Sequence, residues 1–327
     1  MAHGSLNQWL KRTLPLALLF SLVSWGLVHA TESGKQTTIP LSIDEHNRLH
    51  VYFDINGEKA VGTIDTAATF PLIDNRSFDP GLQTQTDNQV EIMGVNGTKM
   101  FDIVELDSIT AGNQRFRNVA VASNKRANFP GPRNILPAKT LIGRTLDFNF
   151  PRNRLDVYDR ALMRPRYHRR SWFHYTEIEK LLFIEVSING TTGLALIDTG
   201  SDTSYLNAAF VDAAKLAEVA NSAHQMVGAD GRQLHIRAVS AKRLKLGRYR
   251  YRKFEMLSAD TEIFEHLGLA DTPAMVLGMD VLQAYRLQID REAKRIHLLQ
   301  PHTSLVRTNV IPSRLSRDAT EKSLGIK

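Results

Sequence analysis

The sequence predicts an all-β protein made of two homologous lobes, arranged as a pseudo-twofold dimer within one chain and separated by a cleft. Three observations lead to this prediction. A unit of about 115 residues occurs twice, both copies begin with a β-hairpin signal, and helix signals are few. Self-similarity at a fixed offset indicates that one structural unit has been duplicated.

The repeat consists of an ordered series of matches. Ile55-Asn56-Gly57 matches Ile188-Asn189-Gly190 at an offset of 133 residues. Near the end of each copy, Leu141-Ile142-Gly143 matches Val276-Leu277-Gly278 at an offset of 135. The offset changes by only two residues between these matches, which indicates one ancestral unit present twice.

Each copy opens with a hairpin in which Asn-Gly joins two short apolar strands, because this dipeptide readily adopts the positive φ angles of a tight turn. The expected strands and turns are 50–55, Asn56-Gly57 and 59–64 in the first copy, and 182–188, Asn189-Gly190 and 193–197 in the second. A second hairpin is expected later in each copy, turning at Asn96-Gly97 and at Asp230-Gly231.

Helices are expected in two places. Residues 208–220 are rich in alanine and follow Asn207, a good N-cap, and residues 261–267 end at Gly268.

The N-terminus has the features of an export signal. Lys11 and Arg12 precede an apolar run, Leu14 to Val28, and Val28-His29-Ala30 resembles a cleavage site. The run is short for a membrane span of about 20 residues, and a retained N-terminal anchor is the alternative. The chain is therefore expected to act outside the cytoplasm, in the periplasm or the extracellular medium.

The expected organisation has five parts. They are a signal or anchor at 1–30, an N-terminal lobe at 31–160, an irregular basic linker at 161–179, a C-terminal lobe at 180–300, and a polar tail at 301–327. The chain has no cysteine, so stability must come from core burial rather than from disulfides.

Two carboxylates stand at equivalent places in the repeat. Asp65-Thr66-Ala67-Ala68 and Asp198-Thr199-Gly200-Ser201 each close an apolar strand, 133 residues apart. A single acid at a strand end is usually a turn or capping residue, but two in register predict one shared site. Two carboxyls in contact cannot both ionise, so one serves as an acid and the other as a base. Amide hydrolysis requires such a pair, because one group takes a proton from water while the other donates a proton to the carbonyl oxygen.

With these motifs, each copy resembles a lobe of the retropepsin-like and pepsin-like aspartic peptidases. The resemblance includes the hairpin, Asp-Thr-Gly, a glycine-containing flap and the final hydrophobic-hydrophobic-Gly loop, and it covers roughly residues 48–160 and 180–300. It implies closed β-barrel lobes, a catalytic dyad of Asp65 and Asp198, and no cofactor. It also implies cross-lobe hydrogen bonds from Thr66 and Thr199.

The resemblance assigns two flap hairpins to the substrate-binding cleft, one for each lobe. Their residues are Gly94, Val95, Asn96 and Gly97 in the first lobe and Gly228, Ala229, Asp230 and Gly231 in the second.

The two acid loops differ in two positions. Ala67 stands where the family usually has glycine, whereas Gly200 lets backbone approach a carboxylate closely. Ser201 offers a hydroxyl where the first loop has Ala68. Since hydrogen bonds lower a carboxylate pKa, the hypothesis is that Asp198 carries the charge and Asp65 the proton.

Other functions have weaker signals. A metal site at His46 and His50 lacks further ligands, and no other catalytic motif is present. The basic stretch 242–253 alternates charged and apolar residues, as a half-exposed hairpin does, and attraction to anionic lipid or wall polymers is a secondary reading. Nucleic acid is not expected as a partner of an exported chain.

The sequence therefore predicts a monomeric aspartic endopeptidase that cleaves peptide or protein substrates with Asp65 and Asp198. The alternative is a duplicated β-barrel binding or scaffold module that has lost peptidase activity. Ala67 favours this alternative, and the two intact Asp-Thr pairs oppose it.

Overall fold

The computed structural model describes residues 37–79, 83–94, 97–125, 131–161, 168–220, 224–227 and 233–301. The expected signal, the linker segment 162–167, both flap tips and the tail beyond residue 301 lie outside these ranges. Strands make up most of the described chain, and helices are short.

The strands of the N-terminal half are β1 (Thr37–Ile43), β2 (Leu49–Ile55), β3 (Glu58–Asp65), β4 (Leu72–Asp74), β5 (Gln83–Gly94), β6 (Gly97–Ala111), β7 (Gln114–Asn124), β8 (Asn134–Pro137), β9 (Thr145–Asn149) and β10 (Arg154–Tyr158). Three short 3-10 turns, η1 (Asn75–Ser77), η3 (Ala138–Thr140) and η4 (Phe150–Arg152), interrupt them.

The strands of the C-terminal half are β11 (His168–His174), β12 (Thr176–Ile178), β13 (Leu181–Ile188), β14 (Thr191–Ile197), β15 (Tyr205–Leu206), β16 (Ala217–Glu218), β17 (His224–Val227), β18 (Gln233–Leu246), β19 (Tyr249–Ser258), β20 (Ala274–Leu277), β21 (Arg286–Asp290) and β22 (Arg295–Pro301). The helices are α1 (Ala208–Ala213), α2 (Glu262–His266) and α3 (Met279–Leu282).

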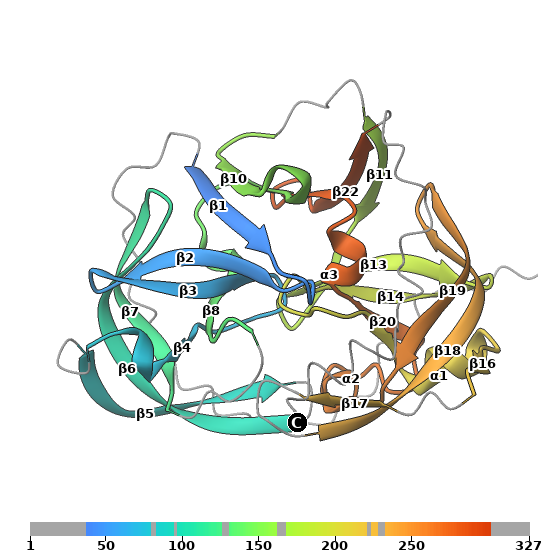
Figure 1. The fold of residues 1–327 in the computed structure, drawn as a ribbon, viewed down its shortest axis with the longest axis horizontal. Helices are drawn as coiled ribbons and strands as arrows, with labels where there is room; N and C mark the ends of the chain where they lie inside the picture. Colours follow the sequence, from blue (N-terminus) through green and yellow to red (C-terminus); the bar gives the residue numbers. More distant parts are fainter. Residues whose placement is uncertain are drawn as a thin grey trace, which may run out of the picture.

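Each half folds into a curved β-sheet that is closed by an additional pairing between two of its strands. In the N-terminal lobe the order is β2-β3-β8-β4-β7-β6-β5, and an added pairing of β2 with β6 closes the sheet. In the C-terminal lobe the order is β12-β13-β14-β20-β15-β19-β18-β16, closed by pairing of β13 with β18. The two lobes lie side by side in Figure 1, and the sequence prediction of an all-β, two-lobed fold is confirmed.

A third sheet joins the lobes, in the order β11-β22-β21-β9-β10-β1. Three of its strands come from each half, and the central pair β9–β21 places Leu146 opposite Ile289 and Phe148 opposite Leu287. These side chains belong to the main buried cluster, which runs through both halves. The main buried cluster therefore joins the two halves, and smaller clusters lie within each lobe.

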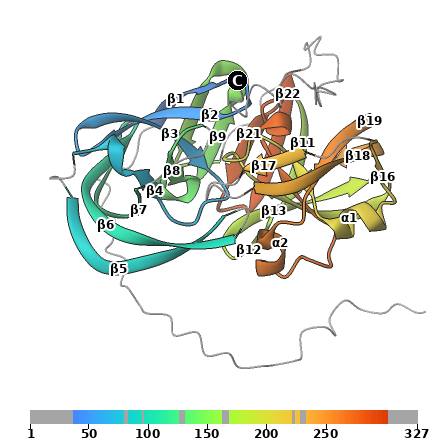
Figure 2. The ribbon, with the colours of Figure 1, turned by 60° about the horizontal axis from the view of Figure 1, so that its bottom comes forward.

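The long β5–β6 hairpin curves under the N-terminal lobe and reaches toward the other lobe (Figures 1 and 2). At its far side, β5 contacts α2 of the C-terminal lobe. The opposite hairpin, β17–β18, pairs Val227 with Gln233 next to its tip. Both lobes thus carry a second hairpin, as the repeat predicts.

The structure corrects the prediction that 161–179 is an irregular linker. Residues 168–174 form β11, which pairs along its whole length with β22, and residues 176–178 form β12. The reason is burial, since Ser171 and Phe173 face the core between exposed neighbours. The basic residues mask this alternation in the sequence.

The predicted helix 208–220 is too long. Asn207 caps α1 as expected by accepting a hydrogen bond from the Phe210 N–H at 3.0 Å, but the helix ends at Ala213. Lys215 adopts a positive φ of 50°, and the next residues form β16 against β18. Tertiary pairing therefore overrides the helix propensity of the alanine-rich run.

The structure also changes the register of the repeat. Ile197 lies opposite Leu277 in the β14–β20 pair, and Ile64 lies opposite Leu136 in the β3–β8 pair. The counterpart of Leu277 is thus Leu136, at an offset of 277 − 136 = 141, and not Ile142. The match at Leu141-Ile142-Gly143 is a local similarity of sequence, whereas strand pairing decides structural equivalence.

An ion pair within the joining sheet links the halves. The guanidinium of Arg286 on β21 donates to both carboxylate oxygens of Asp147 on β9, through Nε at 2.7 Å and through Nη2. Asp147 is fully buried. Its neutralisation by Arg286 is therefore a condition for joining the lobes.

We predict that Arg286→Ala lowers the free energy of unfolding by about 3–5 kcal/mol, because it leaves a buried carboxylate without its partner. Replacing both residues with apolar ones, Asp147→Leu with Arg286→Met, should cost less than the single change. Urea unfolding measures both. Arg237→Ala, which breaks an exposed pair with Glu218, serves as the control and should cost at most about 1 kcal/mol. Equal effects of the two single variants would contradict this prediction.

Candidate active site

Asp65 and Asp198 occupy equivalent places at the ends of the central strands. Asp65 ends β3 and lies opposite Pro137 of the parallel strand β8. Asp198 directly follows β14, and its N–H donates to the carbonyl of Leu277 on the parallel strand β20 at 3.1 Å. Each acid is thus held at the carboxyl end of a buried parallel pair.

Thr66 and Thr199 tie the two acid loops together through four reciprocal hydrogen bonds. The N–H of each threonine donates to the hydroxyl of the other, at 3.1 Å for Thr66 and 3.0 Å for Thr199. Each hydroxyl donates in turn to a carbonyl of the opposite lobe, Thr66 to Ile197 at 2.6 Å and Thr199 to Ile64 at 2.7 Å. Both threonines are buried, so these donors and acceptors have no water to replace a lost partner.

Each carboxylate accepts two backbone N–H groups of its own loop. Asp65 Oδ1 accepts from Ala67 at 2.7 Å and Ala68 at 3.2 Å. Asp198 Oδ1 accepts from Gly200 at 2.9 Å and Ser201 at 3.0 Å. The second oxygen of each group stays outside these bonds, and a side-chain hydrogen bond joins the two carboxyls.

The residue two positions after each acid differs between the loops, Ala67 in the first and Gly200 in the second. A Cβ built on Gly200 would overlap the carboxylate of Asp65, so glycine is required at that position. Its counterpart Ala67 carries a methyl group, which packs against a buried cluster of the C-terminal lobe. The backbone N–H of Ala67 still bonds to Asp65, so the first loop keeps its carboxylate anchor.

Burial raises the pKa of both acids. The pKa of Asp65 is raised by burial, against the opposing effect of the Ala67 and Ala68 N–H groups. The pKa of Asp198 is raised well above its ordinary value, first by burial and then by the neighbouring charge of Asp65. The two carboxyls therefore titrate as a pair, and the form that shares one proton between them is favoured.

The hydrogen bonds of the second acid loop contradict the premise of the hypothesis based on Ser201. The Ser201 hydroxyl donates to the carbonyl of Thr203 at 2.8 Å and not to the Asp198 carboxylate. A hydroxyl has one proton to donate, so the expected stabilisation of ionised Asp198 is absent. The Ser201 hydroxyl was identified as a donor from the sequence, but the Thr203 carbonyl was not identified as its acceptor.

The predicted flap residues are only partly described. Gly94 and Gly97 pair across the end of the β5–β6 hairpin, and Gly97 has a positive φ of 119°. Val90 and Ile92 of this hairpin pack in a cluster with Phe70, which follows the first acid loop. The remaining flap candidates, Val95, Asn96, Gly228, Ala229, Asp230 and Gly231, lie outside the described residues.

Comparison with known families decides the classification. A family model described as "Aspartyl protease" matches the chain twice, over residues 51–143 and 184–281, which together exceed half of its length. The chain belongs to the aspartyl protease family.

A solved structure agrees with this classification in its fold. The chain is similar to an aspartic proteinase from Irpex lacteus, with a TM-score of 0.54 and 12% sequence identity over 84% of this chain and 100% of that chain. At this identity the similarity concerns the fold alone. No curated protein sequence matches.

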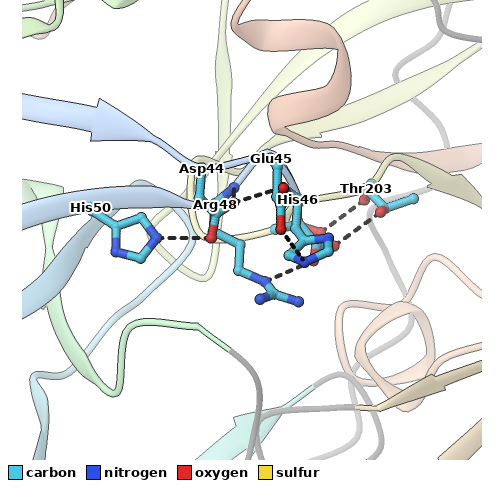
Figure 3. A network of polar contacts seen from close by, with 8 residues as sticks. Asp44, Glu45, His46, Arg48, His50 and Thr203 are labelled. Carbon is cyan, nitrogen blue, oxygen red and sulfur yellow. Dashed lines mark hydrogen bonds and ion pairs between the residues drawn. The ribbon is translucent and has the colours of Figure 1, made fainter. Parts of the chain in front are cut away.

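A polar network next to the second acid loop links the lobes, and it was not predicted from the sequence (Figure 3). Arg48, on the turn between β1 and β2, approaches Asp202 of the loop at 3.5 Å. Asp44 holds that turn by accepting from the N–H groups of His46 and Arg48, and its other oxygen lies 3.0 Å from His50 Nε2. The two histidines considered as metal ligands thus hold structural contacts. No group of metal-ligating residues occurs in the ranges that the structure describes.

Asp280 supports the second acid loop from α3. Its carboxylate accepts from the Ser204 hydroxyl at 2.6 Å and from the Val281 N–H at 2.9 Å, and Ser204 accepts in turn from the Gly278 N–H at 2.9 Å. Burial raises the pKa of Asp280 to about 6, although the hydrogen bonds from Ser204 and Val281 oppose this rise and the charge of Asp202 adds to it. At the offset of 141, its counterpart in the first lobe is Lys139.

We predict that Thr199→Val weakens the tie between the loops. The variant keeps the shape of the side chain but removes one donor and one acceptor, which leaves the Thr66 N–H and the Ile64 carbonyl buried without partners. The free energy of unfolding should fall by about 2–4 kcal/mol, measured by urea unfolding. Thr199→Ser should restore most of it, and Thr191→Val, at the start of β14 where the hydroxyl makes an exposed hydrogen bond, should cost less than about 1 kcal/mol. Equal values for the two valine variants would contradict this role.

Asp280 is expected to make stability depend on pH. Its folded pKa, about 6, lies above the ordinary value of 3.8, so the fold disfavours the ionised form. The penalty is present above pH 6 and disappears as pH falls toward 4. Asp280→Asn keeps the acceptor oxygen and should stabilise the fold by on the order of 2 kcal/mol at pH 7, with little effect at pH 4. Thermal unfolding across this range measures the difference, and a gain independent of pH would contradict the assignment. Asp271→Asn, at an exposed site, is the control.

Proposed function

We propose that this aspartyl protease is an endopeptidase that hydrolyses peptide bonds through a water held between Asp65 and Asp198. The observation that supports this most strongly is the contact of the two carboxyls, which are half-buried and anchored by their own loops. A pair that shares one proton supplies a base and an acid at the same point.

The reaction follows from the protonation of the pair. The ionised member of the Asp65–Asp198 pair takes a proton from the water as the water oxygen attacks the peptide carbonyl carbon, and the protonated member gives its proton to the carbonyl oxygen. A neutral tetrahedral diol results. Its collapse breaks the C–N bond, with one proton passing to the leaving nitrogen and the dyad returning to its starting state.

The environment of the pair favours work at acid pH. Only the singly protonated dyad has both a base and an acid, and this form exists between its two macroscopic pKa values. Burial makes the loss of the last proton difficult and extends this form upward in pH. The side chain of Asp280 is protonated below about pH 6, so the energetic penalty for its ionised form is absent in the same acid range.

The proposal includes a monomeric enzyme that acts outside the cytoplasm on peptide or protein substrates. The export-like segment 1–30 supports the location, and both acids on one chain support the monomer. Within the described part of the chain, no helix has the length and apolar character needed to cross a membrane.

A second candidate is a binding or scaffold module that keeps the fold without hydrolysis. Ala67, where the other loop has an essential glycine, is the observation that favours it. The retained anchors of Asp65 and the intact threonine pair favour the enzyme instead.

The two candidates differ in a direct test. We predict that the chain digests an unfolded protein at acid pH, and that Asp65→Asn and Asp198→Asn each reduce kcat by at least about a thousandfold while the fold is retained. Asp271→Asn, at an exposed site, should keep normal activity. Peptide fragments separated by mass spectrometry give the readout. A folded but inactive native chain that still binds peptides would support the binding module, and full activity in either dyad variant would overturn the mechanism.

A further inference from the structure

One exposed surface of the C-terminal lobe carries a dense set of cations that the dyad does not use. It lies on the β18–β19 hairpin and is here called the cationic face. Its exposed members are Lys242, Arg243, Lys245, Arg248, Arg250, Arg252 and Lys253. The intervening residues Leu244, Leu246, Tyr249 and Tyr251 are buried, so alternation directs the charges to the outer side.

The arrangement within this face is electrostatically unfavourable for the protein alone. Arg243 lies opposite Arg252, and Lys245 lies opposite Arg250, in the antiparallel pairing. Like charges directly across two strands destabilise a hairpin. Among the described residues, no carboxylate forms an ion pair with a member of the cationic face. An anionic partner outside the described chain would therefore reduce the repulsion between these cross-strand cations.

One end of the cationic face borders a cavity. It has a volume of about 220 Å³ and is lined by Arg169, Arg248, Tyr249, Arg250, Tyr251 and Gln300. Three of its lining residues are arginines, and a guanidinium group binds phosphate oxygens through paired hydrogen bonds. Arg250 belongs both to the cavity and to the cross-strand cation pairs, so the two features form one surface.

The cationic face is remote from the dyad. Tyr205, which lies near Asp198, pairs with Leu257 at the other end of β19. Leu257 is seven positions after Arg250, a distance of roughly 23 Å along a strand. In Figure 1, β18 and β19 form the outer rim of the C-terminal lobe. A partner bound there would leave the cleft free.

We propose that the cationic face docks the protein on a membrane surface rich in anionic phospholipid. Charge complementarity supports the occupant, because phosphate headgroups would relieve the repulsion between the cross-strand cations and fit the guanidinium-lined cavity. A feature of the sequence favours a membrane over a soluble polyanion as the partner of the cationic face. Its apolar run from Leu14 to Val28 directs it to a membrane, whether that run is cleaved or retained.

Vesicle flotation with the full chain tests this proposal. The probes are neutral phosphatidylcholine vesicles and vesicles with roughly 30 mol% phosphatidylglycerol, at low and high salt. The test variant carries Gln at Arg243, Lys245, Arg250 and Arg252. The matched control carries Gln at four exposed cations of the other lobe, Lys59, Arg117, Arg152 and Arg160.

The test variant should bind anionic vesicles on the order of several hundredfold more weakly than the native chain at low salt, since each of the four cations near such a surface contributes about fivefold. The control variant should lose less than about tenfold, and high salt should remove the difference. Binding to neutral vesicles, which reports the N-terminal apolar run, should be the same in all three chains. Removing the cross-strand repulsion should keep or raise the melting temperature of the test variant, which separates lost binding from lost fold.

Three results would overturn the proposal. Equal loss in both variants would assign the effect to net charge. Unchanged binding of the test variant would assign it to the apolar run. Binding to soluble polyphosphate that depends on the same four cations, without any preference for anionic vesicles, would assign the face to a soluble polyanion.

Discussion

The reciprocal hydrogen bonds between Thr66 and Thr199 are the constraint on which the rest of the structure depends. Two acid loops from separate lobes must meet closely enough for their carboxyls to share a hydrogen bond, although burial makes that meeting unfavourable. Each threonine meets this demand by bonding the backbone of the opposite loop, so neither loop can shift without breaking bonds in both. The joining sheet and its Arg286–Asp147 pair hold the lobes at the required distance.

Much of the fold could be predicted because the two copies carry the same local signals. Asn56 and Asn189 both adopt positive φ in the predicted turns, and each is followed by a glycine with positive φ. The positions of Asp65 and Asp198 follow from the same repeat, since equivalent residues of two equivalent lobes meet at the pseudo-twofold axis. These features depend on residues close together in the sequence.

The parts that could not be predicted depend on contacts between distant segments. β11 forms because β22 offers a partner more than 120 residues away, and no local pattern in its arginine-rich sequence reveals this. The Ser201 hydroxyl donates to the Thr203 carbonyl, a partner that depends on the conformation of the loop. Arg48 and Asp202 meet across the lobes with no common motif. Asp280 has an altered pKa because of burial that its sequence neighbours do not disclose.

The departure from symmetry between the two loops has a consequence for chain direction. A peptide runs from an amino to a carboxyl end, and a site with perfect twofold symmetry would accept it equally well either way round. Here Ala67 carries a methyl group where its counterpart Gly200 has only a hydrogen atom, and Lys139 stands where the other half has Asp280. The two orientations of one peptide therefore differ in energy. Duplication within a single chain allowed this difference to arise, since two identical subunits could not have diverged at one half alone.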